Sequence, residues 1–283
     1  HGNSVMMLAI FGMNDHIVEY LLGHNGSVAG NSAGFTPLMA ATFIGRDDWA
    51  QRLLARGASV NDTDYSGHTA MMIACAQLRF GEWSTLRNGK ESMHYLPGSA
   101  YLHNMLGPDY RYVAVRKVER AYERRDRRRI IDVLLAAGAT LDPQTDNGET
   151  ALMSAVRHST IEEVGRLLNA GAFVDQRDRM GRTALWHLVD AWQRLDEDSG
   201  IEKLNMLLAY RADINAADND GNTVMWAAVM QHDQQLIRRL FSAGVRSDVS
   251  NRRGETPLMA MLAVGGDMDE VRILIEQGAD VTA

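Results

Sequence analysis

The chain has 283 residues, of which 46% are apolar and 23% are charged, a composition that excludes bulk disorder. A formal net charge of −7 excludes a chain-wide nucleic-acid surface, and a single cysteine excludes both a disulfide framework and a multi-thiolate zinc site. The longest apolar run, VMMLAIFGM near the start, is about half of the roughly 18 residues that a membrane helix needs. We therefore expect a globular protein that does not enter a membrane.

Segments that begin with glycine recur along the chain with a base period of 33 residues. Examples are GFTPLMAATFIG at Gly34 and GETPLMAMLAVG at Gly254. The related segments begin at Gly2, Gly34, Gly67, Gly148, Gly181, Gly221 and Gly254. Two spacings exceed the base period, by 48 residues after Gly67 and by 7 residues after Gly181. The period predicts one domain over 1–283, with repeats near 1–29, 30–61, 62–142, 143–175, 176–215, 216–248 and 249–283 and an insertion over 81–129.

A second landmark follows each segment: an apolar pair that closes a helix, such as Leu53-Leu54 or Leu167-Leu168. Three residues after this pair stands a glycine in five of the seven copies: Gly57, Gly138, Gly171, Gly244 and Gly278. This placement predicts a helix C-terminus that enters the left-handed region, where a Cβ atom is penalised. In the two remaining copies Asn25 tolerates that conformation, whereas Arg211 adopts it at a cost.

With these two landmarks the chain resembles the ankyrin-repeat family. TPLMAA at Thr36–Ala41 followed by LLARGASVN at Leu53–Asn61 is the closest match to the family pattern. The resemblance covers essentially the whole chain except the insertion. It implies an all-α repeat solenoid of about seven repeats, each a helix-turn-helix unit with a hairpin loop, and a function in binding partners.

The chain departs from the family pattern at the histidine that follows T-P-L. Methionine or tryptophan replaces it throughout: Met7, Met39, Met72, Met153, Trp186, Trp226 and Met259. We expect these residues to pack in the core between repeats, rather than to form a metal site. Glu276, Gln277 and Asp280 predict a polar face on the last repeat.

The insertion is basic, whereas the rest of the chain is acidic. Residues 80–129 carry 11 basic and 6 acidic side chains, and the second half, RYVAVRKVERAYERRDRRRI, favours a helix. Arginine and tyrosine are enriched at protein interfaces. We expect Tyr101, Tyr110, Tyr112, Arg116, Arg120 and Arg124 to bind a partner with an acidic surface. The alternatives are a lid folded onto the acidic repeats, or a flexible excursion.

The turns around the repeated glycines are the other expected contact surface, because the resemblance implies binding there. Their flanking residues vary and change sign from one turn to the next, which suits a protein partner with its own charge pattern. The candidates are Tyr65, His68, Arg179, Arg182, Asn219, Arg252 and Arg253. The plain alternative is ordinary solvated turn chemistry.

Catalytic, cofactor-binding and metal-binding motifs are absent from the sequence. Cys75 occupies a small-residue position of a helix and is expected in the core. His187 and Asp190 are three residues apart on one helix, but no nucleophile or further ligand stands in register with them, so we interpret the pair as incidental.

We therefore expect a non-enzymatic module that binds and inhibits, neutralises or scaffolds a partner protein, such as an enzyme or toxin, and that is monomeric when free. The alternatives are nucleic-acid contact through the arginine-rich helix and a regulatory domain of a larger assembly. The bias towards arginine over lysine suggests a bacterial source, and the first residue, His1, suggests a truncated or processed N-terminus. The compartment, cytoplasmic or periplasmic, stays open.

Overall fold

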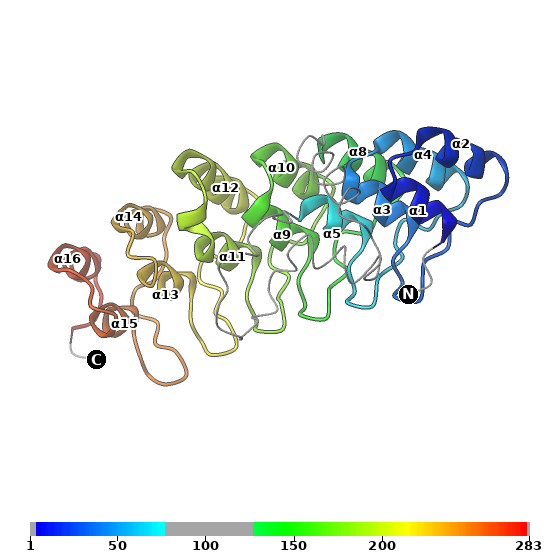
Figure 1. Ribbon diagram of the computed structural model, residues 1–283. Coiled ribbons are helices and arrows are strands. Elements are labelled where there is room, and N and C mark those ends of the chain that lie inside the picture. The colour runs from blue at the N-terminus through cyan, green and yellow to red at the C-terminus, as the bar shows by residue number, and fades with distance from the viewer. Residues whose placement is uncertain (1–3, 77–126, 282–283) are drawn as a thin grey trace. The chain divides into compact units, whose positions relative to one another are not determined.

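A computed structural model describes residues 4–76 and 127–281 of the chain. The chain divides into two compact units: unit 1, His1–Asp146, and unit 2, Asn147–Ala283. Each unit is built from helix pairs, and long loops connect one pair to the next (Figure 1). We call the turn around the glycine at the end of each such loop a tip. Most of the predicted insertion lies outside the described residues.

Unit 1 has its described helices in three pairs. They are α1 (Val5–Phe11) with α2 (Asp15–Gly23), α3 (Pro37–Ile44) with α4 (Asp47–Ala55), and α5 (Ala70–Cys75) with α8 (Arg127–Ala136). The first helices pack in the order α1, α3, α5, and α4 packs on α8. The stack is therefore one in which each pair contacts the next, as expected of a repeat protein.

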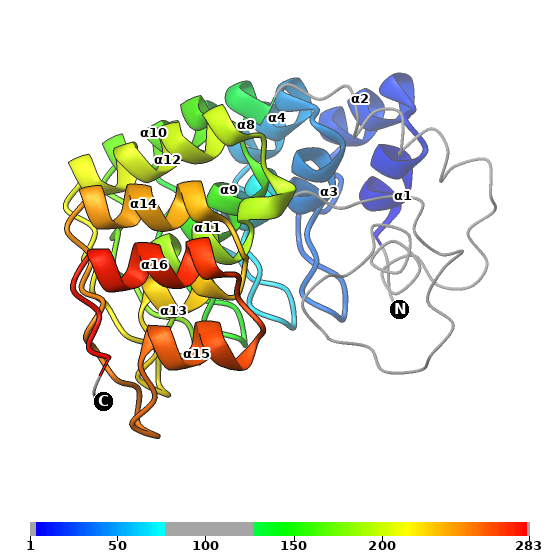
Figure 2. The ribbon, with the colours of Figure 1, turned by 90° about the vertical axis from the view of Figure 1, so that its left-hand side faces the viewer.

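Unit 2 continues the pattern over residues 151–276. Its helices are α9 (Ala151–His158), α10 (Ile161–Asn169), α11 (Ala184–Asp190), α12 (Glu197–Ala209), α13 (Val224–Val229), α14 (Gln234–Ser242), α15 (Pro257–Ala263) and α16 (Met268–Glu276), with the short 3-10 helix η2 (Trp192–Arg194) before α12. Figure 2 shows α10, α12, α14 and α16 as one layer and α11, α13 and α15 as another.

The hairpin loops form no strand in the described ranges. Their ends are joined by single backbone hydrogen bonds, such as that from the N–H of Asp178 to the carbonyl of Arg182 at 2.9 Å. An isolated bridge joins Ala217 and Thr223. The predicted helical repeat fold is confirmed, with the hairpins reduced to closed loops.

A hydroxyl side chain begins the first helix of nearly every pair. Thr36 Oγ1 accepts a hydrogen bond from the N–H of Met39 at 3.1 Å. This N–H lies in the first turn of the helix, where it has no carbonyl partner within the helix. Ser4, Thr69, Thr150, Thr183 and Thr256 make the same cap. Thr223 is the exception, because its side chain makes no cap bond and its buried Oγ1 has no partner in the described structure.

The predicted left-handed helix ends are confirmed. All five glycines after the apolar pairs have positive φ, between 80° and 93°. Asn25 and Arg211 occupy the same position in their repeats, with φ of 59° and 64°. Arg211 therefore holds a conformation that an L side chain disfavours.

Only some of the methionine and tryptophan residues that replace the family's histidine lie in the core. Met7, Met39, Met72 and Met153 are buried, as predicted, whereas Trp186, Trp226 and Met259 are partly exposed. Cys75 is fully buried, so its predicted place in the core is confirmed.

Polar side chains also tie each pair to the next. In unit 1, Asn61 Oδ1 accepts a hydrogen bond from the N–H of Thr140 at 2.8 Å. In unit 2, Asp175 accepts from the N–H of Asp213, and Asn215 accepts from the N–H of Arg246 at 2.9 Å. These bonds follow the second helix of each pair and fix the distance between consecutive repeats.

The prediction of a polar face on the last repeat is wrong in part. Glu276, Gln277 and Asp280 are exposed, but so are the apolar side chains Leu262 and Met268, at 60% and 73%. Residues at the position of Leu262 in the other pairs of unit 2, such as Val189 and Val229, are buried. Among the described residues, no helix combines the length and apolar character needed to cross a membrane.

Candidate partner-binding surface

An aspartate or asparagine three residues before the glycine shapes most of the tips. Asp178 Oδ1 accepts hydrogen bonds from the N–H groups of Met180 and Arg182, at 2.8 and 2.9 Å. The same two bonds, to residues two and four positions later, are accepted by Asn31, Asp64, Asp218 and Asn251. The backbone of these tips is therefore fixed by their own side chains.

Two of the predicted binding residues, His68 and Arg182, bond within their own tips. His68 Nδ1 lies 3.1 Å from a carboxylate oxygen of Asp64, and Arg182 Nε donates to Asp178 Oδ2 at 2.8 Å. The Arg182 guanidinium also lies 4.8 Å from the centre of the Trp186 ring, and only 14% of its side chain is exposed. Both side chains stabilise their turns, and Arg182 offers little free surface to a partner.

Consecutive tips are joined by backbone hydrogen bonds. In unit 2, the N–H of Arg179 donates to the carbonyl of Asn147, Asn219 to Met180, and Arg252 to Asp220, at 2.7–2.9 Å. In unit 1, Tyr65 donates to Ala33 and Asp146 to Ser66. The tips of each unit therefore form a continuous, hydrogen-bonded row.

Glycine is required where one tip meets the next. A Cβ atom added to Gly148 would lie 2.5 Å from the nitrogen of Arg179, and one added to Gly221 would lie 2.9 Å from the nitrogen of Arg252. Both glycines have positive φ. Close approach and left-handed backbone thus explain why glycine stands at these two tips.

The outer side chains of the row in unit 2 form what we call the tip edge: Asn147, Arg179, Met180, Asn219, Asp220, Arg252 and Arg253, all exposed. Asn219 is partly used in the row, since its Nδ2 donates to the carbonyl of Arg179 at 2.7 Å. Arg253 pairs with Glu255 at 3.2 Å. In unit 1, Tyr65 is 62% exposed at the corresponding position. Figure 1 shows the tips at the ends of the loops, away from the second helices of their pairs.

Behind the tip edge lies a buried polar cluster that the sequence pattern did not predict. His187 Nε2 lies 3.0 Å from Asp178 Oδ2, and His187 Nδ1 lies 3.3 Å from Arg157 NH1. Arg157 in turn donates to both carboxylate oxygens of Glu149, at 3.2 and 2.7 Å. The tip before α11 is thus connected to α9, the first helix of the preceding pair, by a chain of hydrogen bonds.

The cluster keeps the imidazole of His187 neutral. Burial lowers the pKa of His187, and the hydrogen bond to Asp178 only partly opposes this effect. Burial acts to raise the pKa of Asp178, but hydrogen bonds from His187 and Arg182 outweigh it and lower that pKa to about 2. A neutral imidazole with its proton on Nε2 donates to Asp178 and accepts from Arg157, so one tautomer satisfies both neighbours.

These contacts also decide how His187 and Asp190 are interpreted. His187 bonds to Asp178, whereas Asp190 pairs with Arg194 at 3.5 Å, so each of the two side chains has a partner of its own. In the described part of the chain, no group of three or more His, Cys, Asp and Glu side chains is arranged to hold a metal ion.

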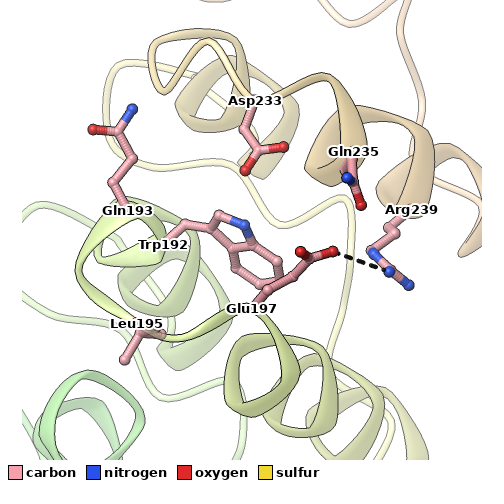
Figure 3. A pocket seen from close by; sticks show the side chains of 7 residues that line it. All are labelled: Trp192, Gln193, Leu195, Glu197, Asp233, Gln235 and Arg239. Carbon is pink, nitrogen blue, oxygen red and sulfur yellow. Dashed lines mark hydrogen bonds and ion pairs between the residues drawn. The ribbon is translucent and has the colours of Figure 1, made fainter.

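A second surface feature lies between α12 and α14. A hollow of about 160 Å³ is lined by Trp192, Gln193, Leu195, Glu197, Asp233, Gln235 and Arg239 (Figure 3). Trp192 packs under it on Gly200, where an added Cβ would lie 3.1 Å from the indole ring. Glu197 and Arg239 form an ion pair across it at 3.5 Å. The seven extra residues of this repeat therefore build a tryptophan-supported helix start, with Asp196 as the N-cap and Glu197 and Asp198 in the first turn of α12.

The remaining predicted binding residues, Tyr101, Tyr110, Tyr112, Arg116, Arg120 and Arg124, lie outside the described residues. Of the rest, Tyr65, Arg179, Asn219, Arg252 and Arg253 are exposed at tips, and the structure brings the last four together on one edge of unit 2. Sequence reasoning missed the Asp178 cluster and the hollow. The aspartate or asparagine three residues before the tip glycine was a visible signal for the cluster.

The family model for ankyrin repeats matches this chain in three copies, at residues 5–82, 120–197 and 196–283. The human Neurogenic locus notch homolog protein 1 is 33% identical over 165 residues, 48% of this chain and 6% of that protein. Human Ankyrin repeat and SOCS box protein 6 is 32% identical over 177 residues, 54% of this chain and 40% of that protein. The chain thus spans less than half the length of these relatives.

Solved structures agree in fold across nearly the whole chain. The ankyrin repeat domain of Bcl-3, described as a member of the IkappaB protein family, superposes with a TM-score of 0.64 at 22% identity, covering 97% of this chain and 99% of that one. The human ASB11 ankyrin repeat domain gives a TM-score of 0.65 at 17% identity, covering 98% and 99%. Notch homolog protein 1, Ankyrin repeat and SOCS box protein 6 and ASB11 are human proteins, and the bacterial source inferred from the arginine bias stays a prediction.

Proposed function

Because the chain belongs to the ankyrin-repeat family, we propose that it binds a partner protein through its tips and acts on that partner by occupying its surface. Ankyrin repeats are protein–protein interaction modules. The finer proposal is that occupation inhibits or neutralises the partner, or holds it in an assembly. The enzyme or toxin partner suggested by the sequence belongs to this proposal and rests on analogy of fold.

The observation that supports binding at the tips is the contrast between their backbone and their outer side chains. The backbone of the row in unit 2 is held by hydrogen bonds between tips and by bonds inside each tip. The side chains of Arg179, Asp220 and Arg252 are exposed and form no hydrogen bond or ion pair within the described structure. Because the backbone of the tips is already fixed, little backbone entropy is lost when a partner binds. The unpaired charges on this backbone can then contribute to recognition of the partner.

Charge reversal on the tip edge tests the proposal. We would immobilise the full chain and compare the proteins retained from a lysate of its source by the wild type and by the double variant Arg179→Glu, Arg252→Glu. We expect the double variant to lose a specific partner, with at least about tenfold lower recovery. Recovery of the same partner at wild-type levels by the double variant would place the binding surface elsewhere.

Arg238→Glu is the matched control. Arg238 is exposed on α14, its side chain forms no hydrogen bond or ion pair within the described residues, and the substitution changes the charge by as much as each of the two tip substitutions does. We expect the control to retain the partner. Addition of the chain to the isolated partner, followed by measurement of the partner's activity, then separates inhibition from scaffolding.

The alternative of nucleic-acid contact through the insertion is tested in the same preparation. Binding of a labelled duplex or single strand would fall steeply with salt if arginine–phosphate contacts carried it. We expect the full chain to bind no more nucleic acid than a variant from which the insertion has been removed.

A further inference from the structure

Charge is separated within unit 2. Residues 147–283 carry 14 Lys and Arg against 21 Asp and Glu, so the unit is acidic as a whole. The tip edge reverses this balance, since it presents Arg179, Arg252 and Arg253, the last paired with Glu255 behind the edge, and Asp220 as its single acidic side chain. A basic edge on an acidic body attracts an acidic ligand to that edge and repels it from the remaining surface.

The arginines of the edge stand in two groups. Arg179 and the 48% exposed Met180 occupy one tip, and Arg252 with Arg253 occupies the tip two repeats later. The intervening tip contributes Asn219, whose amide is bonded to the row, and Asp220. The ligand therefore meets positive charge at both ends of the edge and an apolar side chain near one end.

The hydrogen-bonded row sets the distance between the two groups. Neighbours in one tip are about 3.8 Å apart along the chain, and residues bonded between tips are about 4.8 Å apart, as in adjacent strands. The path from Arg179 to Arg252 runs through Met180, Asn219 and Asp220. It contains two steps along the chain and two steps between tips, so the two arginine Cα atoms are at most about 17 Å apart. An extended chain covers this distance in roughly five residues.

We propose that the tip edge of unit 2 binds an extended, acidic segment of the partner protein, with two carboxylate side chains about five residues apart and an apolar residue next to one of them. This inference rests on the proposed function and specifies the partner's binding segment. A polyanion such as a nucleic acid fits less well, because Asp220 interrupts the edge and the acidic body surrounds it.

The probe for this proposal is a phage-displayed library of random twelve-residue peptides, selected on the full chain. We expect the selected peptides to be enriched in pairs of Asp or Glu with four residues between them. Their affinity should fall roughly five- to tenfold in Arg179→Glu and in the Arg252→Glu, Arg253→Glu variant, and should weaken as salt is raised. The Arg238→Glu control should bind as the wild type does.

Selection of basic or uncharged peptides, or of none, would overturn the acidic-segment proposal. So would acidic peptides that bind equally well to the tip variants, or tighter binding of a labelled oligonucleotide than of any selected peptide. Failure here is distinct from failure of the proposed function: a natural partner that still depends on Arg179 and Arg252 would keep the tips as the binding surface while rejecting an acidic segment as what they recognise.

Discussion

At the residue scale, side chains at fixed distances from the repeated glycines decide the shape of the tips. The aspartate or asparagine three residues before the glycine is visible in the sequence, and its bonds to the backbone follow from its position. The neighbours of Asp178 are not predictable in this way. His187 and Arg157 reach it from two helices, so their contact depends on how α9 packs on α11.

His187 makes stability depend on pH. Its pKa is lowered in the folded state, so the unfolded chain takes up a proton first as pH falls through about 6.5, and stability is lost from that point downwards. We expect His187→Gln to keep both hydrogen bonds and to remove this dependence. Between pH 8 and pH 5.5 the wild type should lose about 1 kcal/mol more than the variant in urea unfolding. Equal losses would mean that His187 is not held neutral.

Asp178 acts in a lower pH range. Because its pKa is lowered to about 2, its contribution to stability is present above about pH 3.8 and is lost only as pH falls towards 2. The two groups therefore titrate in separate windows, and the comparison at pH 5.5 isolates the histidine.

Arg211 offers a test of the helix-end rule. Its φ of 64° is disfavoured for arginine, and five other repeats place glycine there. We expect Arg211→Gly to stabilise the protein by about 0.5–1 kcal/mol, because relief of the left-handed strain exceeds the entropy cost of glycine. Thermal unfolding measures this. A lower melting temperature in the variant would show that Arg211 is not strained.

At the element scale, helix starts follow a rule with one exception. Six of the seven first helices begin at a hydroxyl side chain that caps the helix, but Thr223 makes no such bond and its hydroxyl is buried. The sequence shows the same threonine in register at both Thr183 and Thr223, so it predicts two equal caps. The difference arises from the orientation of the hydroxyl in the packed repeat.

The two threonines form a matched pair for mutation. We expect Thr183→Val to cost about 1 kcal/mol of folding free energy through the lost cap. Thr223→Val should be neutral or stabilising by up to about 1 kcal/mol, since it removes a buried hydroxyl without a partner. Chemical denaturation of the two single variants gives the comparison. Equal destabilisation would imply that Thr223 caps α13 in solution.

At the scale of the whole molecule, the 33-residue period was sufficient to predict the repeat fold, because within each of the two units consecutive helix pairs pack against one another. The period could not show that the seven extra residues form a tryptophan-supported extension of α12, since that depends on the contact of Trp192 with Gly200. It also could not separate tip side chains that bond inwards, such as Arg182, from those that form no hydrogen bond or ion pair within the described residues, such as Arg179. The single domain and the binding role of the insertion stay predictions.

The most direct test of the central proposal is site-specific photo-crosslinking from the tip edge. A photoreactive amino acid would replace Met180 in one preparation and Arg238 in another, and each full chain would be irradiated with the partner bound. We expect a crosslink to the partner from position 180 and none from position 238, because the former lies on the tip edge and the latter on α14. A crosslink from position 238 with none from position 180 would contradict binding through the tips.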